Sequence, residues 1–197
     1  SEENESSSDR YYAIGASYAN GPLNLYLAVD SINYQTWGNG APVSGADDID
    51  DSLTVTFGGN YDFEVVKLFA GAQYFDEIKL SNMKGAVNFE DADSGIATKM
   101  KGWSLGVSGS IPVAGGNVLV GAAYLDAEAA DSESAETTKD DELSRWIVSA
   151  GYDYPFSKRT DVYGVVTYNQ DNLKFTNNAK DQDPYMFGVM VGLRHKF

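Results

Sequence analysis

Hydrophobic and polar residues alternate along most of this chain with a period of two, which is the side-chain period of a β-strand. Residues 53–62 (LTVTFGGNYD), for example, put leucine, valine, phenylalanine and tyrosine on one face and threonine, asparagine and aspartate on the other. No stretch shows a convincing helical period. The pattern predicts nine strands, at 10–20, 23–36, 53–62, 65–80, 98–111, 117–128, 142–154, 160–175 and 185–197.

The predicted strands are long. Most exceed the usual strand length of about 5–6 residues and reach the roughly 9–11 residues that cross a bilayer at a tilt. Their second face is polar, which is compatible with water. We therefore expect an all-β fold, a transmembrane antiparallel β-barrel that encloses a water-filled lumen. Segment 117–128 is apolar on both faces, so its pattern alone does not orient it.

Short and long connections alternate along the chain. The short ones are 20–22, 62–65, 112–116 and 156–159, and the long ones are 37–52, 81–97, 131–141 and 176–184. In an antiparallel meander this alternation gathers every short turn at one end and every long loop at the other. Outer-membrane barrels have this plan, with short periplasmic turns and longer extracellular loops.

The acidic residues follow the same division. The formal net charge is -15, and there is no cysteine. Eighteen acids, against three lysines, lie in residues 1–9 and the four long connections, so one end of the molecule carries the whole excess. This charge disfavours nucleic acid as a partner, because phosphates need a basic surface. The absence of cysteine excludes disulfides and thiol chemistry.

One acidic cluster in the first long connection is a candidate cation site. Asp47, Asp48, Asp50 and Asp51 carry oxygen ligands of the kind that Ca²⁺ and Mg²⁺ prefer, and such ions also bridge lipopolysaccharide phosphates. The same charges could instead concentrate cations at the outer mouth, or simply keep the loops solvated. We predict no other cofactor and no firm metal site.

Aromatic residues mark both ends of the predicted strands. Trp103 and Trp146 lie near the long-loop ends, whereas Tyr61, Tyr152 and Tyr154 lie near the short turns, as does the final residue, Phe197. Two aromatic girdles are expected of a barrel in lipid, because amphipathic rings suit the headgroup boundary.

Three segments resemble the trimeric general porins of Gram-negative bacteria, in the branch that includes neisserial and burkholderial porins. They are YYAIGASYANGP at 11–22, SAGYDYPFSKRTDVYG at 149–164 and MFGVMVGLRHKF at 186–197. The turn Ser157-Lys158-Arg159-Thr160 matches the penultimate periplasmic turn of that family, which commonly reads SKRT. The likeness covers nearly all the strands and none of the long loops.

The resemblance implies a barrel of 16 strands in the bacterial outer membrane, with both chain ends in the periplasm. An antiparallel meander of nine strands puts its two ends on opposite sides, and single-chain bacterial barrels have even strand numbers. We therefore expect residues 1–197 to be a single porin domain, the C-terminal portion, with strands 8–16. Residues 1–9 would belong to an extracellular loop, and the N-terminal half would supply seven strands.

Further partners also follow from the resemblance. They are membrane lipid, lipopolysaccharide, two further copies in a homotrimer, and the barrel-assembly machinery, which recognises a terminal strand that ends in an aromatic such as Phe197. The alternative is a miscount and a complete barrel of eight to ten strands with a structural or adhesion role.

The predicted function is passive diffusion of ions and small hydrophilic solutes, with selectivity set by pore width and by charges on the wall. The inward-facing candidates are Lys67, Gln73, Glu77, Lys79, Arg145, Asp153, Asp161, Thr167, Arg194 and Lys196. In the family, the constriction loop and most of the wall arginines that oppose it lie in the N-terminal half, so ion selectivity does not follow from the resemblance.

An enzyme is not expected. Barrel hydrolases need a Ser/His or Asp/His constellation, and the chain has a single histidine. His195 lies on the apparently outward face of the last predicted strand, which suits a structural role better than that of a general base.

Overall fold

The computed structural model describes residues 10–33, 37–38, 41–42, 51–79, 99–130, 141–175 and 181–196, and all of its regular elements are β-strands. The strands are β1 (Arg10–Asn20), β2 (Leu23–Asn33), β3 (Trp37–Gly38), β4 (Ala41–Pro42), β5 (Ser52–Asp62), β6 (Lys67–Lys79), β7 (Lys99–Val113), β8 (Gly116–Ala129), β9 (Glu142–Pro155), β10 (Thr160–Lys174) and β11 (Tyr185–His195). Among these residues no helix is long and apolar enough to span a membrane.

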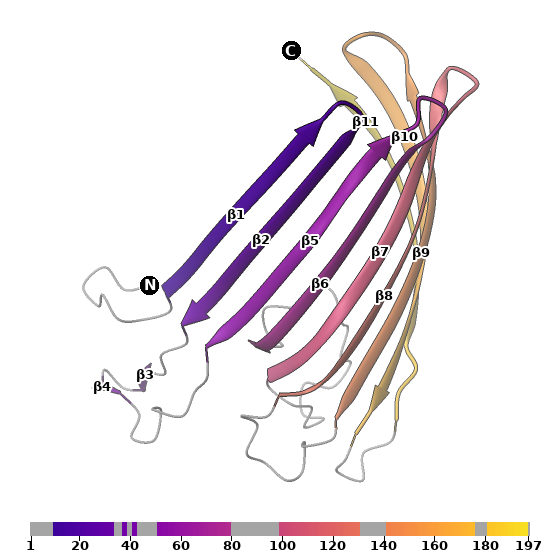
Figure 1. The fold of residues 1–197 in the computed structure, drawn as a ribbon. Helices are drawn as coiled ribbons and strands as arrows, with labels where there is room; N and C mark the ends of the chain where they lie inside the picture. Colours follow the sequence, from indigo (N-terminus) through magenta and orange to yellow (C-terminus); the bar gives the residue numbers. More distant parts are fainter. Residues whose placement is uncertain are drawn as a thin grey trace.

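Nine of these strands form one antiparallel sheet in the order β1-β2-β5-β6-β7-β8-β9-β10-β11. Each strand pairs with the strands next to it along the chain, so the sheet is an up-and-down meander (Figure 1). All nine predicted strands are confirmed, with ends that differ by up to three residues. The remaining two strands, β3 and β4, are each two residues long and pair with each other. They lie within a connection that we predicted to be a loop.

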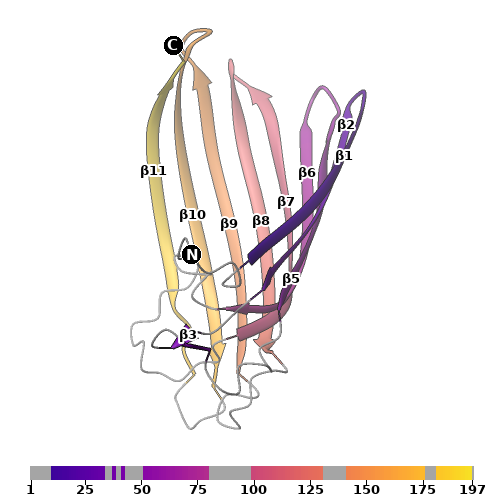
Figure 2. The same cartoon turned by 90° about the vertical axis from the view of Figure 1, so that its left-hand side faces the viewer.

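The sheet is curved and open. Figures 1 and 2 show it curling from β1 round to β11, and these two strands form its free edges. Within the described part of the chain, β1 and β11 pair only with β2 and β10, so this sheet does not close into the complete small barrel that we considered as an alternative.

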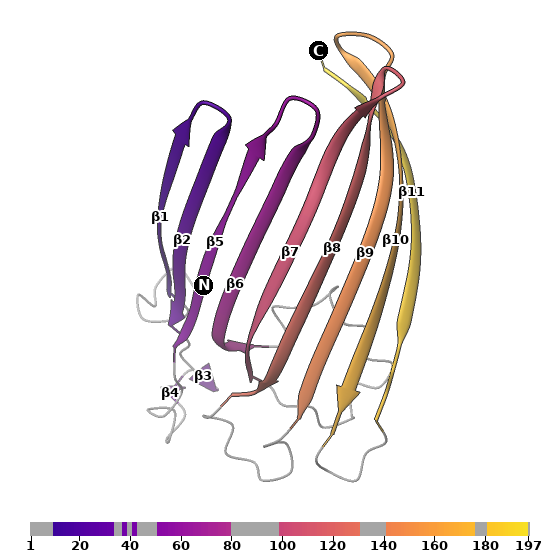
Figure 3. The same ribbon diagram turned by 45° about the vertical axis from the view of Figure 1, so that its right-hand side comes forward.

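The short turns all lie at one end of the sheet, which we call the turn end, and the opposite end is the loop end (Figure 3). Gly21 has φ +56° and precedes Pro22, as a two-residue type II′ hairpin requires. Ala114 and Gly115 both have positive φ (51° and 82°), which is the type I′ geometry. These tight turns fix the register of the strands that they join.

The register separates the two faces. One row of neighbours runs Ala28, Thr56, Gln73, Ser104, Leu125, Arg145 and Asp171, and the adjacent row runs Leu27, Phe57, Ala72, Leu105, Tyr124 and Trp146. We call the face that carries the first row the polar face and the other the apolar face. The alternation in the sequence therefore predicted the faces correctly.

The two faces are buried to different extents at the loop end. On the polar face, Thr54 and Phe75 are 8% and 4% exposed, whereas Tyr74 and Trp103 on the apolar face are 47% and 41% exposed. Side chains on the concave side of a curved sheet converge, while those on the convex side spread apart. The difference in burial indicates that the polar face is the concave one.

Candidate pore-lining surface

Small and hydroxyl-bearing side chains cover the middle of the polar face. They hydrogen-bond across the strands: Gln73 Nε2 donates to Thr56 Oγ1 (3.1 Å), Ser149 Oγ donates to Thr167 Oγ1 (2.9 Å), and Asn24 Nδ2 donates to Asn60 Oδ1 (3.2 Å). Between them lie residues with little or no side chain, such as Gly71. The result is a hydrophilic wall that leaves room for water.

Arg145 and Asp171 form a deeply buried charge pair of the polar face. The two residues are register partners on β9 and β10. Arg145 Nε and Nη2 donate to the two carboxylate oxygens of Asp171, and the side chains are only 10% and 4% exposed. A planar guanidinium matches a carboxylate in this bidentate geometry. The wall charge that we predicted at Arg145 is therefore balanced by an aspartate that the sequence pattern did not single out.

Glu77 and Lys79 lie where β6 is irregular. The register between β6 and β7 shifts between Phe75 and Ile78, which is a β-bulge, and Glu77 has a positive φ of 54°. The carboxylate of Glu77 lies 3.0 Å from Lys99 Nζ, and both side chains are almost fully buried. Glu77 is therefore paired within the sheet. Lys79 ends β6, and its side chain lies outside the described residues.

A second group of charges lies at the turn end of β9, β10 and β11. Arg194 Nε donates to Asp161 Oδ1 (3.1 Å), its Nη2 donates to Asp161 Oδ2, and the same Nη2 lies 3.4 Å from Asp153 Oδ2. The structure thus brings together three of the predicted residues from three strands. The Arg194 side chain remains 58% exposed.

Lys67 and Lys196 are the other predicted bases of the polar face and its rim. Lys67 opens β6 opposite Asp62, and its Nζ lies 5.6 Å from the centroid of the Phe69 ring, which is a cation–π distance. Lys196 follows β11, is exposed, and its backbone N–H donates to the Arg159 carbonyl (2.8 Å). That these residues line a pore stays a prediction.

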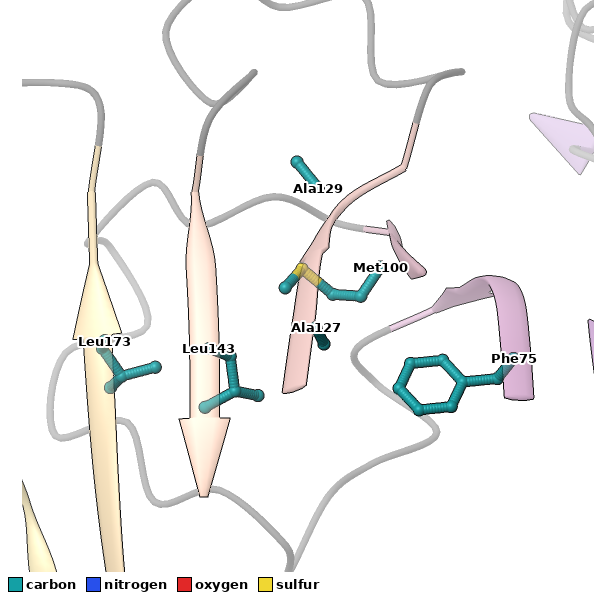
Figure 4. Close-up of a cluster of buried hydrophobic side chains, with 6 residues drawn as sticks. All are labelled: Phe75, Met100, Ala127, Ala129, Leu143 and Leu173. Carbon is teal, nitrogen blue, oxygen red and sulfur yellow. The ribbon is translucent and has the colours of Figure 1, made fainter. Parts of the chain in front are cut away.

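A hydrophobic cluster at the loop end is a feature of the polar face that the sequence analysis missed. Its members come from the five adjacent strands β6 to β10 (Figure 4): Phe75, Met100, Ala127, Ala129, Leu143 and Leu173. All six are at most 5% exposed. A signal did exist, because the segment that became β8 is apolar on both faces. The loop end of the polar face is therefore packed, and only the middle and the turn end are open and hydrophilic.

The apolar face carries aromatic residues at both of its ends. At the loop end, Tyr74 and Trp103 are register partners, as are Tyr124 and Trp146, and the ring centroids of Trp103 and Tyr124 are 5.6 Å apart. At the turn end, Tyr61 pairs with Phe63 (4.4 Å) and Tyr152 with Tyr154 (6.4 Å). These positions match the two girdles predicted from the sequence, although Phe197 itself lies outside the described residues.

The predicted cation site at 47–51 lies mostly outside the described residues. Asp47, Asp48 and Asp50 lie outside the described residues, and Asp51 Oδ1 accepts a hydrogen bond from Asn33 Nδ2 (2.8 Å). No group of three or more histidine, aspartate or glutamate side chains in the described ranges is arranged to hold a metal ion. A divalent cation at residues 47–51 stays a prediction.

His195 takes part in the sheet. Its Nδ1 lies 2.8 Å from the hydroxyl of Thr160, its register partner on β10. This contact ties the last strand to the preceding turn.

Comparison with known proteins agrees with this geometry. The family model described as Gram-negative porin matches residues 1–174. An outer membrane porin protein of Bordetella pertussis is 29% identical over 199 residues, which cover 95% of this chain and 46% of that protein.

A solved structure shares the fold as well. The anion-selective porin from Comamonas acidovorans aligns with a TM-score of 0.59 and 25% identity, over 95% of this chain and 49% of that one. The chain therefore spans about half the length of the relatives that it matches.

Proposed function

Because this chain belongs to the Gram-negative porin family, we propose that the protein forms water-filled channels in the bacterial outer membrane. Ions and small hydrophilic solutes diffuse through these channels passively. The family consists of channels rather than enzymes, and the proposed activity requires no catalytic group.

The observation that carries this proposal is the chemical difference between the two faces of one sheet. The convex face exposes leucine, valine and phenylalanine between two aromatic girdles, which suits the hydrocarbon core and its two interfaces. The concave face presents amides, hydroxyls and glycines, which suit water. A side-chain-filled structural barrel would need bulky residues across the middle of its interior instead.

The rest of the barrel is proposed to come from the N-terminal half of the same protein. The described sheet has two free edges, β1 and β11, whose outer backbone groups need partners because unpaired N–H and C=O groups are costly in lipid. Relatives about twice as long leave room for the missing strands. We also propose a homotrimer, which rests on the resemblance to trimeric porins.

The orientation is proposed from loop length and charge. The long acidic connections are extracellular, and the short turns, together with the C-terminus, are periplasmic. In this orientation the loop end meets lipopolysaccharide, where Asp47, Asp48, Asp50 and Asp51 can bind Ca²⁺ or Mg²⁺. The last strand, with Phe197, is the proposed signal for the barrel-assembly machinery.

Planar-bilayer recording on the natural full-length protein tests the proposed function. We expect stepwise conductance increases in KCl, together with entry of small sugars into liposomes that contain the protein. The same preparation denatured before addition is the control. Absence of conductance steps from correctly folded protein overturns the proposal.

A further inference from the structure

On the described polar face, some charged side chains lie beside a partner of opposite charge and others do not. Three of the four bases on this face and its rim face an aspartate: Arg145 binds Asp171, Arg194 binds Asp161, and Lys67 is the register partner of Asp62. The fourth base, Lys196, lies at the rim. Each of these pairs is electrically neutral. The selectivity of this part of the wall is therefore decided by the carboxylates that remain.

Asp30 is the carboxylate that has no charged neighbour on this face. It lies on β2 toward the loop end, in the row of Thr54 and outside the hydrophobic cluster of β6 to β10. Its register partners on the neighbouring strands are Ala13 and Thr54, neither of which is charged. The residues two positions away on the same face of β2 are Ala28 and Ile32, which are also uncharged. Asp30 is half-buried and makes no hydrogen bond or ion pair with any of the described residues.

Asp153 adds a second negative charge at the turn end. Arg194 is shared between Asp161 and Asp153, so that this group of three keeps an excess of one carboxylate. Asp153 Oδ1 is buried and has no hydrogen-bond partner among the described residues. The exposed Lys196 at the rim offsets part of this charge. Asp30 has no such base near it in the register.

We propose that this half of the wall favours cations over anions and that Asp30 is the residue in it which chiefly determines the preference. The inference rests on the proposed channel function. A carboxylate in a low-dielectric wall attracts cations from the lumen and repels anions, over a distance of about 10 Å at 0.1 M salt.

The test is the reversal potential of the natural full-length protein in a planar bilayer under a KCl gradient, which gives the permeability ratio of K⁺ to Cl⁻. We expect Asp30→Asn to lower this ratio about twofold at 0.1 M salt and much less at 1 M, because salt screens the charge. The matched control is Asp126→Asn, which removes the same charge from the apolar face.

A second variant keeps the test decisive if Asp30→Asn inserts poorly. Asp30→Cys is modified in the open channel with an anionic or a cationic thiol reagent, because the chain has no cysteine of its own. The anionic reagent should restore the ratio and the cationic reagent should lower it further. The inference is overturned if Asp30→Asn and Asp126→Asn behave alike, or if the two reagents have the same effect. Absence of channels from the native protein contradicts the proposed function instead.

Discussion

Two arginine–aspartate pairs show how strongly burial changes the contribution of a single residue to stability. Arg145–Asp171 and Arg194–Asp161 have the same chemistry, the same fork-like hydrogen bonding and the same cross-strand register. The Arg145 side chain is 10% exposed and that of Arg194 is 58% exposed. In the first pair the Asp171 carboxylate, 4% exposed, has little water to solvate it if it loses its guanidinium. In the second pair the Asp161 carboxylate is 13% exposed and its partner lies open to water, so removing that partner lets water reach the carboxylate.

We therefore predict that Arg145→Gln lowers the free energy of unfolding by about 3–5 kcal/mol, because it leaves the Asp171 carboxylate buried without a counter-charge. The measurement is urea-induced unfolding of the natural full-length protein in lipid vesicles. Replacing both partners with leucine should recover most of the loss, since buried ion pairs are often replaceable by apolar residues of similar size.

Arg194→Gln is the matched control for this prediction. It removes the same group from a pair that water already reaches, and exposed ion pairs contribute little to stability. An equal loss from the two single variants would contradict the role that we assign to burial.

At the scale of one strand, the glycines of β7 show how closely the neighbouring strands approach. A Cβ atom added to Gly102 would collide with the carbonyl oxygen of Asp126 and would lie 2.7 Å from the Cα of Ala127 on β8. A Cβ atom added to Gly106 would meet Ala123 Cβ at 3.7 Å, which is an ordinary contact. Both glycines lie on the polar face of the same strand, and they differ in the space beside them.

Gly102→Ala should therefore destabilise the protein by about 1–3 kcal/mol, because the backbone of β7 or β8 has to shift. Gly106→Ala should leave the stability unchanged or raise it by up to about 1 kcal/mol, since alanine restricts the unfolded chain. Thermal unfolding followed by circular dichroism compares the two variants. Equal midpoints would show that strand spacing does not limit this position.

The strands were predictable because period-two alternation depends only on which face meets water, and a membrane-spanning sheet repeats that condition on every strand. The pattern could not reveal the bulge at Glu77, because a bulge moves one residue out of the alternation without changing residue types. It also missed the partner of Arg145, since Asp171 lies 26 residues away and becomes a neighbour only through the register. Apolar residues such as Leu143 and Leu173 on the polar face interrupt the alternation, and only the fold shows that they pack together.

At the scale of the whole molecule, the two ends of the sheet differ in chemistry. The loop end continues into the acidic connections, whereas the tight turns at the other end include Lys158 and Arg159. In an outer membrane the acidic end would face the medium and its divalent cations. The proposed orientation therefore has consequences that can be measured in cells.

Single cysteines can establish the orientation without interference from this chain, which has none. Asp51 lies at the loop end and Lys158 lies in the turn 156–159, and both residues are exposed. The two variants are therefore Asp51→Cys and Lys158→Cys. The reagent is a maleimide carried on a polymer too large to pass through the lumen. On intact bacteria it should label Asp51→Cys, and it should label Lys158→Cys only after the outer membrane has been permeabilised. Labelling of Lys158→Cys on intact cells, with Asp51→Cys protected, would reverse the proposed orientation. Unsubstituted protein gives the background.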